Sequence, residues 1–331
     1  MIQRFMFLLL AAVSLACTVD EPVDSAKGDP NLTITPESGD PEGIDESVFA
    51  LLNLDYPGLE KVKSSYEEED MYMAAYYLLE YYRSRTEVYN SNPDLVNPTL
   101  TVAEKRIADQ ALEGRFYVKY GGVESVDEVT GIETYWSFLD ADGNVDWTYL
   151  PQGVDYKSEF SYQKNRHQWM LPQAKAYRAT GNEDYFNNWI DSYWSWLEKY
   201  PCPEGKTSQM EWTGLQLSSR ISVQTEILWY YIHSSGFTPA LLTKFLKALY
   251  QHVECQRSNW YNTATSNIRL SQEQAFTIAA IMYPEFVKSE EWLSEGASAI
   301  ANQLETQFLE DGVHNEFDIS YHFGETGLAA F

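Results

Sequence analysis

The sequence has few basic residues for its size. It holds 23 lysines and arginines against 49 aspartates and glutamates, which gives the 331-residue chain a net charge of −26. Such a surface repels nucleic acid at long range, and no basic cluster offsets the repulsion. We therefore expect no nucleic-acid partner. The bulk charge also disfavours a heavily anionic ligand, although a few local arginines and lysines can focus a site against it.

Cysteines and metal-binding spacings are scarce as well. Of the three cysteines, Cys17 lies in the N-terminal leader, while Cys202 and Cys255 could form one disulfide that their spacing does not demand. No Cys-x-x-Cys or His-x-x-x-His pair occurs. The sequence therefore indicates no zinc site and no cofactor in these residues.

The N-terminal apolar run is too short to span a membrane. Residues 1–16 carry one positive charge, Arg4, before a short apolar stretch and small residues, which is the pattern of a secretory signal peptide. The motif Ser14-Leu-Ala-Cys17 resembles the bacterial lipobox, in which the cysteine becomes the lipidated first residue. We expect a membrane anchor at Cys17 and a location in the periplasm or on the outer-membrane surface. An ordinary cleaved signal with an incidental cysteine is the alternative.

Residues 17–45 have few large apolar side chains. They are rich in Asp, Glu, Pro, Gly, Ser and Thr, a composition that cannot bury a core and that predicts a flexible, disordered tether. From about Glu46 the pattern becomes helical. The folded domain is therefore expected over residues 46–331.

Helical patterns dominate this domain, and beyond residue 160 no alternating strand pattern intervenes. The predicted helices span residues 71–82, 101–112, 162–179, 183–199, 209–234, 239–256, 268–282 and 289–309. Apolar steps of three and four occur in Leu242, Phe245, Leu249 and Val253, and in Leu293, Ala297, Ile300, Leu304 and Phe308. Short turns favour antiparallel helix pairs, in an α-solenoid or a closed toroid. No repeat occurs at a fixed period, which counts against the standard solenoid families.

Residues 114–160 differ from the rest of the domain. Gly121-Gly122, Asp142-Gly143 and Pro151-Gln-Gly153 separate short aromatic segments, which predicts a long ordered loop with short strands. The chain as a whole holds 24 tyrosines and 10 tryptophans. Such rings can cover the apolar faces of sugars, and an aromatic-rich helical core is the alternative that would account for most of them.

The first candidate site is Asn165-Arg-His-Gln-Trp169, placed at the start of a predicted helix. Arg166 could bind a carboxylate or sulfate, His167 could donate or accept a hydrogen bond, and Trp169 could offer a ring face to a sugar. Helix capping and core packing are the alternative roles for the same residues.

Two further blocks carry polar residues that an ordinary helical core would not need. The block from Glu211 to Arg220 contains Trp212, and Arg220 could form an internal ion pair with Glu226, which favours a structural role. The block Ser258–Arg269 contains Asn267, which capping alone could explain.

The last candidate is the stretch Asp311–His322 near the end of the sequence. Its Asp-Gly opening marks a turn after a helix, so Tyr321 and His322 are expected on a loop. This pair could serve proton transfer or anchor the loop through hydrogen bonds.

These blocks, together with Pro172-Gln-Ala-Lys-Ala-Tyr-Arg-Ala-Thr180 and Tyr283-Pro-Glu-Phe286, resemble the N-terminal helical domain of the heparinase II/III group. The resemblance is greatest to heparin-sulfate lyases of the heparinase III type. It implies an incomplete (α/α) toroid over residues 46–331, with a sugar cleft across the helix ends. It also implies an acidic polysaccharide, heparan sulfate or a heparin-like glycan, as the substrate of a β-elimination.

The resemblance also assigns roles. Asn267 matches the residue that neutralises the uronate carboxylate, and Tyr321 matches the general acid, which in one version of the mechanism is also the base. The substrate-binding residues it implies are Arg166, His167, Trp169, Trp212, Arg220, Arg269 and His322. A phenol with a pKa near ~10 needs nearby cations to act as a base at neutral pH.

The sequence departs from that group in one respect. Such lyases continue into a C-terminal β-sandwich, which supplies a second catalytic histidine and could hold a structural metal, whereas this sequence stops at Phe331. We therefore expect a truncated chain with weak or no activity alone. The alternatives are a non-catalytic glycan-binding lipoprotein and a lyase for another polyuronate, alginate or chondroitin. The net charge favours low-sulfated heparan sulfate.

Overall fold

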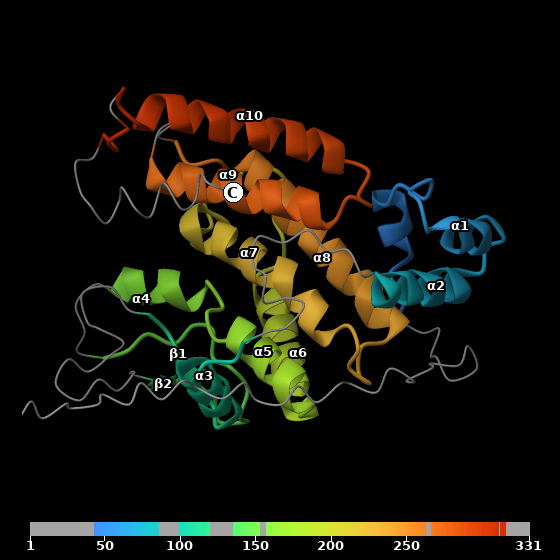
Figure 1. Cartoon of the computed structure of the whole chain (residues 1–331). Coiled ribbons are helices and arrows are strands. Elements are labelled where there is room, and N and C mark those ends of the chain that lie inside the picture. The colour runs from blue at the N-terminus through green and yellow to red at the C-terminus, as the bar shows by residue number, and fades with distance from the viewer. Residues whose placement is uncertain are drawn as a thin grey trace, which may run out of the picture.

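The computed structural model describes residues 43–85, 99–119, 135–152, 157–262, 266–310 and 312–315. Within these ranges the fold is helical apart from one two-stranded antiparallel sheet (Figure 1). The longer helices are α1 (Glu60–Glu67), α2 (Met71–Ser84), α3 (Val102–Leu112), α4 (Lys157–Lys164), α5 (Met170–Thr180), α6 (Glu183–Lys199), α7 (Gly214–Tyr231), α8 (Pro239–Ser258), α9 (Asn267–Met282) and α10 (Ser289–Gln307). The short elements are the 3-10 helices η2 (Glu46–Leu51) and η4 (Met210–Trp212) and the strands β1 (Arg115–Tyr117) and β2 (Tyr135–Ser137).

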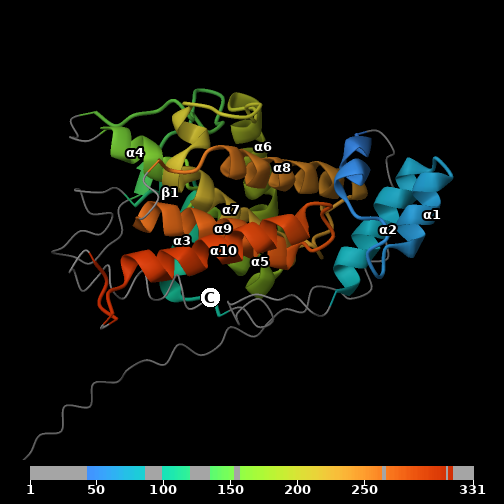
Figure 2. The ribbon, with the colours of Figure 1, turned by 90° about the horizontal axis from the view of Figure 1, so that it is seen from above.

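The helices pack as successive antiparallel pairs. Helices α3, α5, α7 and α9 form a row in which each contacts the next. Helices α6, α8 and α10 pack against α5, α7 and α9, respectively, so each pair adds one step to the row (Figures 1 and 2). Both views place α10 along the outside of α9. This arrangement confirms the predicted all-α fold, an incomplete (α/α) toroid of antiparallel helix pairs.

The N-terminal hairpin of α1 and α2 is fastened to the far end of this row. Both η2 and α2 pack against α8. The fully buried Glu285, in the turn between α9 and α10, accepts hydrogen bonds from Tyr81 (2.6 Å) and Tyr82 (3.2 Å) and pairs with Arg85 (2.9 Å). A buried carboxylate is tolerated when it is paired and hydrogen-bonded in this way. This contact joins the start of the domain to its last helical pair.

Most helix boundaries agree with the sequence. The predicted helix 183–199 coincides with α6, which begins after the capping side chain of Asn182. Two predicted helices are interrupted. The single helix 162–179 is two helices, α4 and α5, separated by a turn at residues 165–169, and the helix 209–234 is η4 and α7, separated at Thr213. Pro172 lacks an N–H and fits only the first turn of a helix, so α5 begins just before it. His167 has a φ of 57°, which reverses the chain between α4 and α5.

The core is aromatic, as the alternative to a sugar-binding role proposed. Seven of the ten tryptophans are buried: Trp147, Trp169, Trp189, Trp196, Trp212, Trp229 and Trp292. The outermost pair is held close by Gly296, because a Cβ on this residue would lie 2.0 Å from Thr277 Oγ1 of α9. None of the helices in the described ranges is both long and apolar enough to cross a membrane.

Candidate active site

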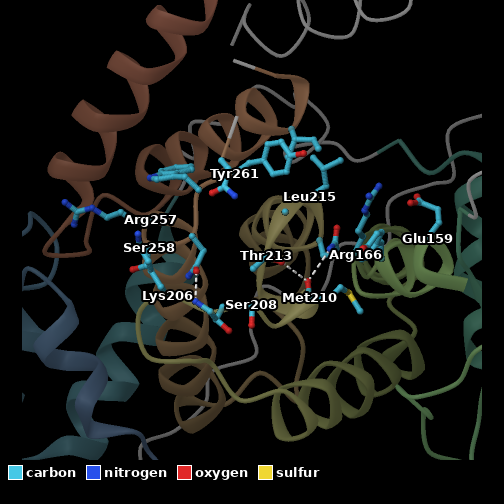
Figure 3. A pocket seen from close by; sticks show the side chains of 18 residues that line it. Glu159, Arg166, Lys206, Ser208, Met210, Thr213, Leu215, Arg257, Ser258 and Tyr261 are labelled. Carbon is cyan, nitrogen blue, oxygen red and sulfur yellow. Dashed lines mark hydrogen bonds between the residues drawn. The ribbon is translucent and has the colours of Figure 1, made fainter. Parts of the chain in front are cut away.

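A pocket of about 840 Å³ opens where several helix ends meet (Figure 3). It lies at the end of α4, the start of α7, the end of α8 and the start of α9, and the loop between α6 and η4 forms one wall. The residues that line it include Glu159, Tyr162, Arg166, Lys206, Thr207, Ser208, Thr213, Gln216, Arg257, Asn259, Trp260, Tyr261, Asn262 and Ile268. The pocket is large enough for a sugar unit of an extended chain. Its position at the helix ends agrees with the predicted cleft.

Arg166 is the predicted substrate-binding residue that lines this pocket directly. Its side chain is half-buried, and its Nε is buried without a hydrogen-bond partner among the described residues. Burial lowers the pKa of the guanidinium, and the nearby Glu159 carboxylate acts in the opposite direction. A buried N–H without an acceptor is costly, so this group is suited to receive an anion.

Two other cations line the pocket, and their surroundings differ. Arg257 is held by the carboxylates of Glu291 and Glu295 of α10, the latter 2.6 Å from its Nη2. Lys206 is exposed on the loop wall and makes no hydrogen bond or ion pair with the part of the chain described here. The local balance therefore leaves Arg166 and Lys206 available to a ligand, despite the acidity of the whole chain.

Asn267 is the first residue of α9 and does not cap it. The cap is Ser266, whose hydroxyl accepts a hydrogen bond from Arg269 N at 3.2 Å. Asn267 Oδ1 accepts one from the adjacent Ile268 N at 2.7 Å, which leaves its Nδ2 without a partner among the described residues. Ile268 itself lines the pocket. The capping alternative is thereby removed, and an amide donor remains beside the pocket.

Arg269 does not line the pocket itself but contacts Trp260, which does. Its guanidinium lies 4.4 Å from the ring centre of the pocket residue Trp260. Its Nε donates to Glu273 at 2.5 Å. This ion pair neutralises Arg269 in part, and the cation–π contact fixes the indole at the pocket edge.

Four predicted substrate-binding residues lie in the protein interior instead: His167, Trp169, Trp212 and Arg220 have no exposed surface. The prediction that they contact substrate is corrected by this burial. The Trp169 ring packs between Phe116 (4.9 Å) and Trp147 (5.9 Å), so no face is free for a sugar. Burial lowers the pKa of His167 well below its usual range, with contributions from Arg220 and His252. These residues support the pocket from beneath.

Arg220 is held in this interior by hydrogen bonds to backbone carbonyls. Its Nη1 donates to Asn165 O (2.8 Å) and Gln216 O (3.2 Å), and its Nη2 donates to Glu211 O (2.5 Å). The guanidinium also lies 4.1 Å from the ring centre of Trp196. Hydrogen bonds to these carbonyls, rather than the expected ion pair with Glu226, hold the charge, which gives Arg220 a scaffold role.

The remaining predicted residues, Tyr321, His322 and Cys17, lie outside the described residues. Sequence reasoning missed Tyr162, Lys206 and the run Trp260-Tyr-Asn262. The run belongs to a block that was singled out, and a Trp-Tyr pair within a polar loop is the signal that could have marked it. No group of three potential metal ligands occurs in the described ranges.

An arc of antiparallel α-hairpins with a pocket at the helix ends defines an incomplete (α/α) toroid. The profile of the heparinase II/III N-terminus matches residues 48–329. The chain therefore belongs to the heparinase II/III family, and this matched region comprises its helical domain.

Similar proteins agree with this placement. A heparin-sulfate lyase of Bacteroides thetaiotaomicron is 36% identical over 321 residues, covering 96% of this chain and 44% of that protein. A heparin-sulfate lyase of Pedobacter heparinus is 26% identical over 281 residues, covering 83% of this chain and 40% of that protein. A crystal structure of heparinase III superposes with a TM-score of 0.76 at 37% identity, covering 87% of this chain and 43% of the other. The chain thus spans less than half the length of these relatives.

Proposed function

We propose that this chain is the helical domain of a polysaccharide lyase, and that the pocket holds a uronic-acid glycan of the heparan sulfate type for cleavage by β-elimination. The observation that carries the proposal is the buried, unpartnered Nε of Arg166 in the pocket wall. A guanidinium in this setting is suited to a carboxylate or sulfate, the two anions of such glycans.

The elimination needs the uronate charge to be neutralised before the C5 proton can leave. Asn267 supplies an amide Nδ2 without a partner among the described residues, beside the pocket residue Ile268. Donation from this amide to the carboxylate stabilises the charge that moves onto it as the C5–H bond breaks. Arg166 adds a positive charge in the same pocket. The two groups therefore favour the enolate-like intermediate over the ground state.

Proton transfer is assigned to Tyr321. As an acid, its phenol protonates the leaving O4, and as the phenolate it takes the C5 proton. Because a free phenol titrates near ~10, the cations of the pocket are needed to favour the phenolate. His322, next in the sequence, is assigned an accessory role in substrate binding.

The pocket charges favour a substrate of low sulfation. Arg166 and Lys206 are the two lining cations without a carboxylate partner among the described residues, while Arg257 is already paired with carboxylates. Two such cations match one uronate carboxylate and one further anion. The net charge of −26 disfavours a longer run of sulfates.

The test measures binding and turnover separately. The chain and its Asn267→Ala and Tyr321→Phe variants are titrated calorimetrically with oligosaccharides of low- and high-sulfated heparan sulfate, alginate and chondroitin. Formation of the unsaturated uronate product is followed by absorbance. We expect the parent to bind low-sulfated heparan sulfate most tightly and to produce the unsaturated product only slowly, and both variants to retain binding and lose this turnover.

Other outcomes would change the assignment. Binding without turnover by the parent would support a non-catalytic glycan-binding protein, and preference for alginate or chondroitin would change the substrate. No binding to any of the four would overturn the proposal. The lipid anchor is tested by fatty-acid labelling in a bacterial host, where the chain should be labelled and recovered with membranes in the periplasm or on the outer-membrane surface, and Cys17→Ser should abolish the label.

A further inference from the structure

Two cysteines far apart in the sequence lie side by side below the pocket wall. Cys202 lies in the loop after α6 and is half-buried, while Cys255 lies on α8 and is 4% exposed. The Cys202 Sγ is 3.7 Å from the carbonyl oxygen of Gln251, one helical turn before Cys255 on α8. Each thiol shifts the pKa of the other, upward for Cys202 and downward for Cys255. Both are free in this structure.

The surroundings of the two sulfurs differ in a way that favours reaction. The neighbouring thiol raises the pKa of Cys202 and lowers that of Cys255, and the Arg220 guanidinium acts to lower both. Asn259 Nδ2 lies 3.5 Å from Cys255 Sγ, a further donor toward that sulfur. Cys255 is therefore the thiolate-prone partner, and Cys202 is the one that solvent can reach.

A bond between these sulfurs would join two walls of the pocket. The loop that holds Cys202 contributes Lys206, Thr207 and Ser208 to the lining, and the end of α8 contributes Arg257 and Ser258. At present Asn259 links these walls: its Oδ1 accepts from Thr207 N (2.8 Å), and its Nδ2 donates to Gly205 O (2.9 Å).

We propose that Cys202 and Cys255 form a disulfide when the folded chain meets a disulfide oxidant such as oxidised glutathione, and that this bond fixes the 200–209 loop to the end of α8. Cys202, the sulfur that solvent can reach, passes its proton to the Cys255 sulfur and attacks the glutathione disulfide; the glutathione thiolate that leaves takes up this proton and departs as reduced glutathione. The Cys255 thiolate then attacks the Cys202 sulfur and expels the second. Two thiols thereby lose two protons and two electrons, which the oxidant takes up.

The test uses the whole chain, incubated with oxidised glutathione or with a reductant, then alkylated and digested with trypsin. Cleavage after Lys199, Lys206, Lys247 and Arg257 places the cysteines in peptides 200–206 and 248–257. We expect these two peptides to be linked after oxidation. We also expect the Tm of the oxidised chain to exceed that of the reduced chain by about 5 °C or more, because the bond closes a long loop.

Cys202→Ser is the matched control, since Cys202 is half-buried and its replacement leaves the core intact. This variant should show neither the linked peptide nor the Tm increase. Alkylation of both cysteines after oxidation, or a glutathione adduct on either without a link, would overturn the proposal. A linked peptide without a Tm increase would overturn the fixing of the loop. Neither measurement requires a glycan, so the outcome is separate from that of the proposed function.

Discussion

Two arginines from the blocks that resemble the lyase family, Arg220 and Arg166, have opposite surroundings. Arg220 has no exposed surface, and its N–H groups donate to three backbone carbonyls. Arg166 lines the pocket, and its buried Nε has no acceptor among the described residues. The protein supplies acceptors for the first arginine, whereas the second keeps a donor that has none among the described residues. The hydrogen-bond partners of the two arginines therefore distinguish the interior beneath the pocket from the pocket wall.

The largest expected effect is that of acid on this interior. Burial lowers the pKa of His252 to about 3, and the pKa of His167 lies well below its usual range. Both imidazoles bind protons in the unfolded chain at a higher pH than in the native one. Their stabilisation is therefore present above about pH 6.5 and is lost as the pH falls below it, by about 1.4 kcal/mol per pH unit for each histidine. Urea denaturation between pH 7 and pH 4 measures this loss, which should total on the order of 7 kcal/mol for these two histidines.

The decisive window is pH 6.5 to 5, where exposed carboxylates stay charged and the slope belongs to the histidines. His252→Gln is the control. Its amide can replace the present bonds of the imidazole, which involve Ala248 O at 2.8 Å and Arg220 Nε at 3.4 Å. Burial also lowers the pKa of His233, to about 4, so three histidines share the slope and this variant should reduce it by about a third in this window. A flat stability profile of the parent chain from pH 7 to 5 would contradict the neutral, buried state of both histidines.

The next largest effect is expected for Arg220→Met, which keeps much of the side-chain volume. The variant leaves the buried carbonyls of Asn165 and Glu211 without these donors, at a cost of about 1–3 kcal/mol each. We expect the free energy of unfolding to fall by about 3 kcal/mol, measured by urea denaturation. Arg166→Met, which removes no hydrogen bond to the described residues, should cost less than about 1 kcal/mol. Equal losses in both variants would erase the distinction between the two arginines.

Most of the helices and their pairing could be predicted from the sequence. Helix signals are local: the steps of three and four from Leu242 to Val253 and the cap at Asn182 depend on nearby residues alone. The break at residues 165–169 was missed because its turn uses His167 at a positive φ, where glycine or asparagine would have been the expected signal.

The candidate site was predictable in part. The resemblance selected the right blocks, but each block passes from the pocket into the core within one or two residues. Arg166 lines the pocket while His167 is fully buried, and their adjacency in sequence carries no information about which side chain points inward. Lys206 and Trp260 became site residues only through tertiary packing of the loops that hold them.

The third largest effect is expected for Arg166 in the pocket wall. Arg166→Ala should weaken glycan binding by roughly 10–100-fold, because a charge-assisted hydrogen bond to an anion contributes about 1.5–3 kcal/mol. Calorimetric titration with low-sulfated heparan sulfate oligosaccharides measures the change. Arg106→Ala on α3, outside the pocket, is the matched loss of one positive charge and should leave the affinity within about threefold. Equal weakening by both variants would mean that net charge alone governs binding.

The smallest effect is expected on the outer face of α10, which contrasts with α8. The predicted stripes of both helices have the same spacing, yet Leu249 of α8 has no exposed surface, whereas Leu304 of α10 is 41% exposed. Leu304→Ala should therefore change the free energy of unfolding by about 0.5 kcal/mol or less, and Leu249→Ala should lower it by about 2–5 kcal/mol. Urea denaturation of the two variants side by side makes the comparison.

The reason for the difference is the position of each helix in the row rather than its composition. Helix α8 packs against α7, α9 and α2, so its apolar stripe is covered. Helix α10 packs along α9 through a face that includes Trp292, Gly296 and Gln303, and the stripe through Leu304 lies on another face. A loss in Leu304→Ala as large as that in Leu249→Ala would show that this stripe is packed in solution, and would contradict the exposed placement of the outer face of α10.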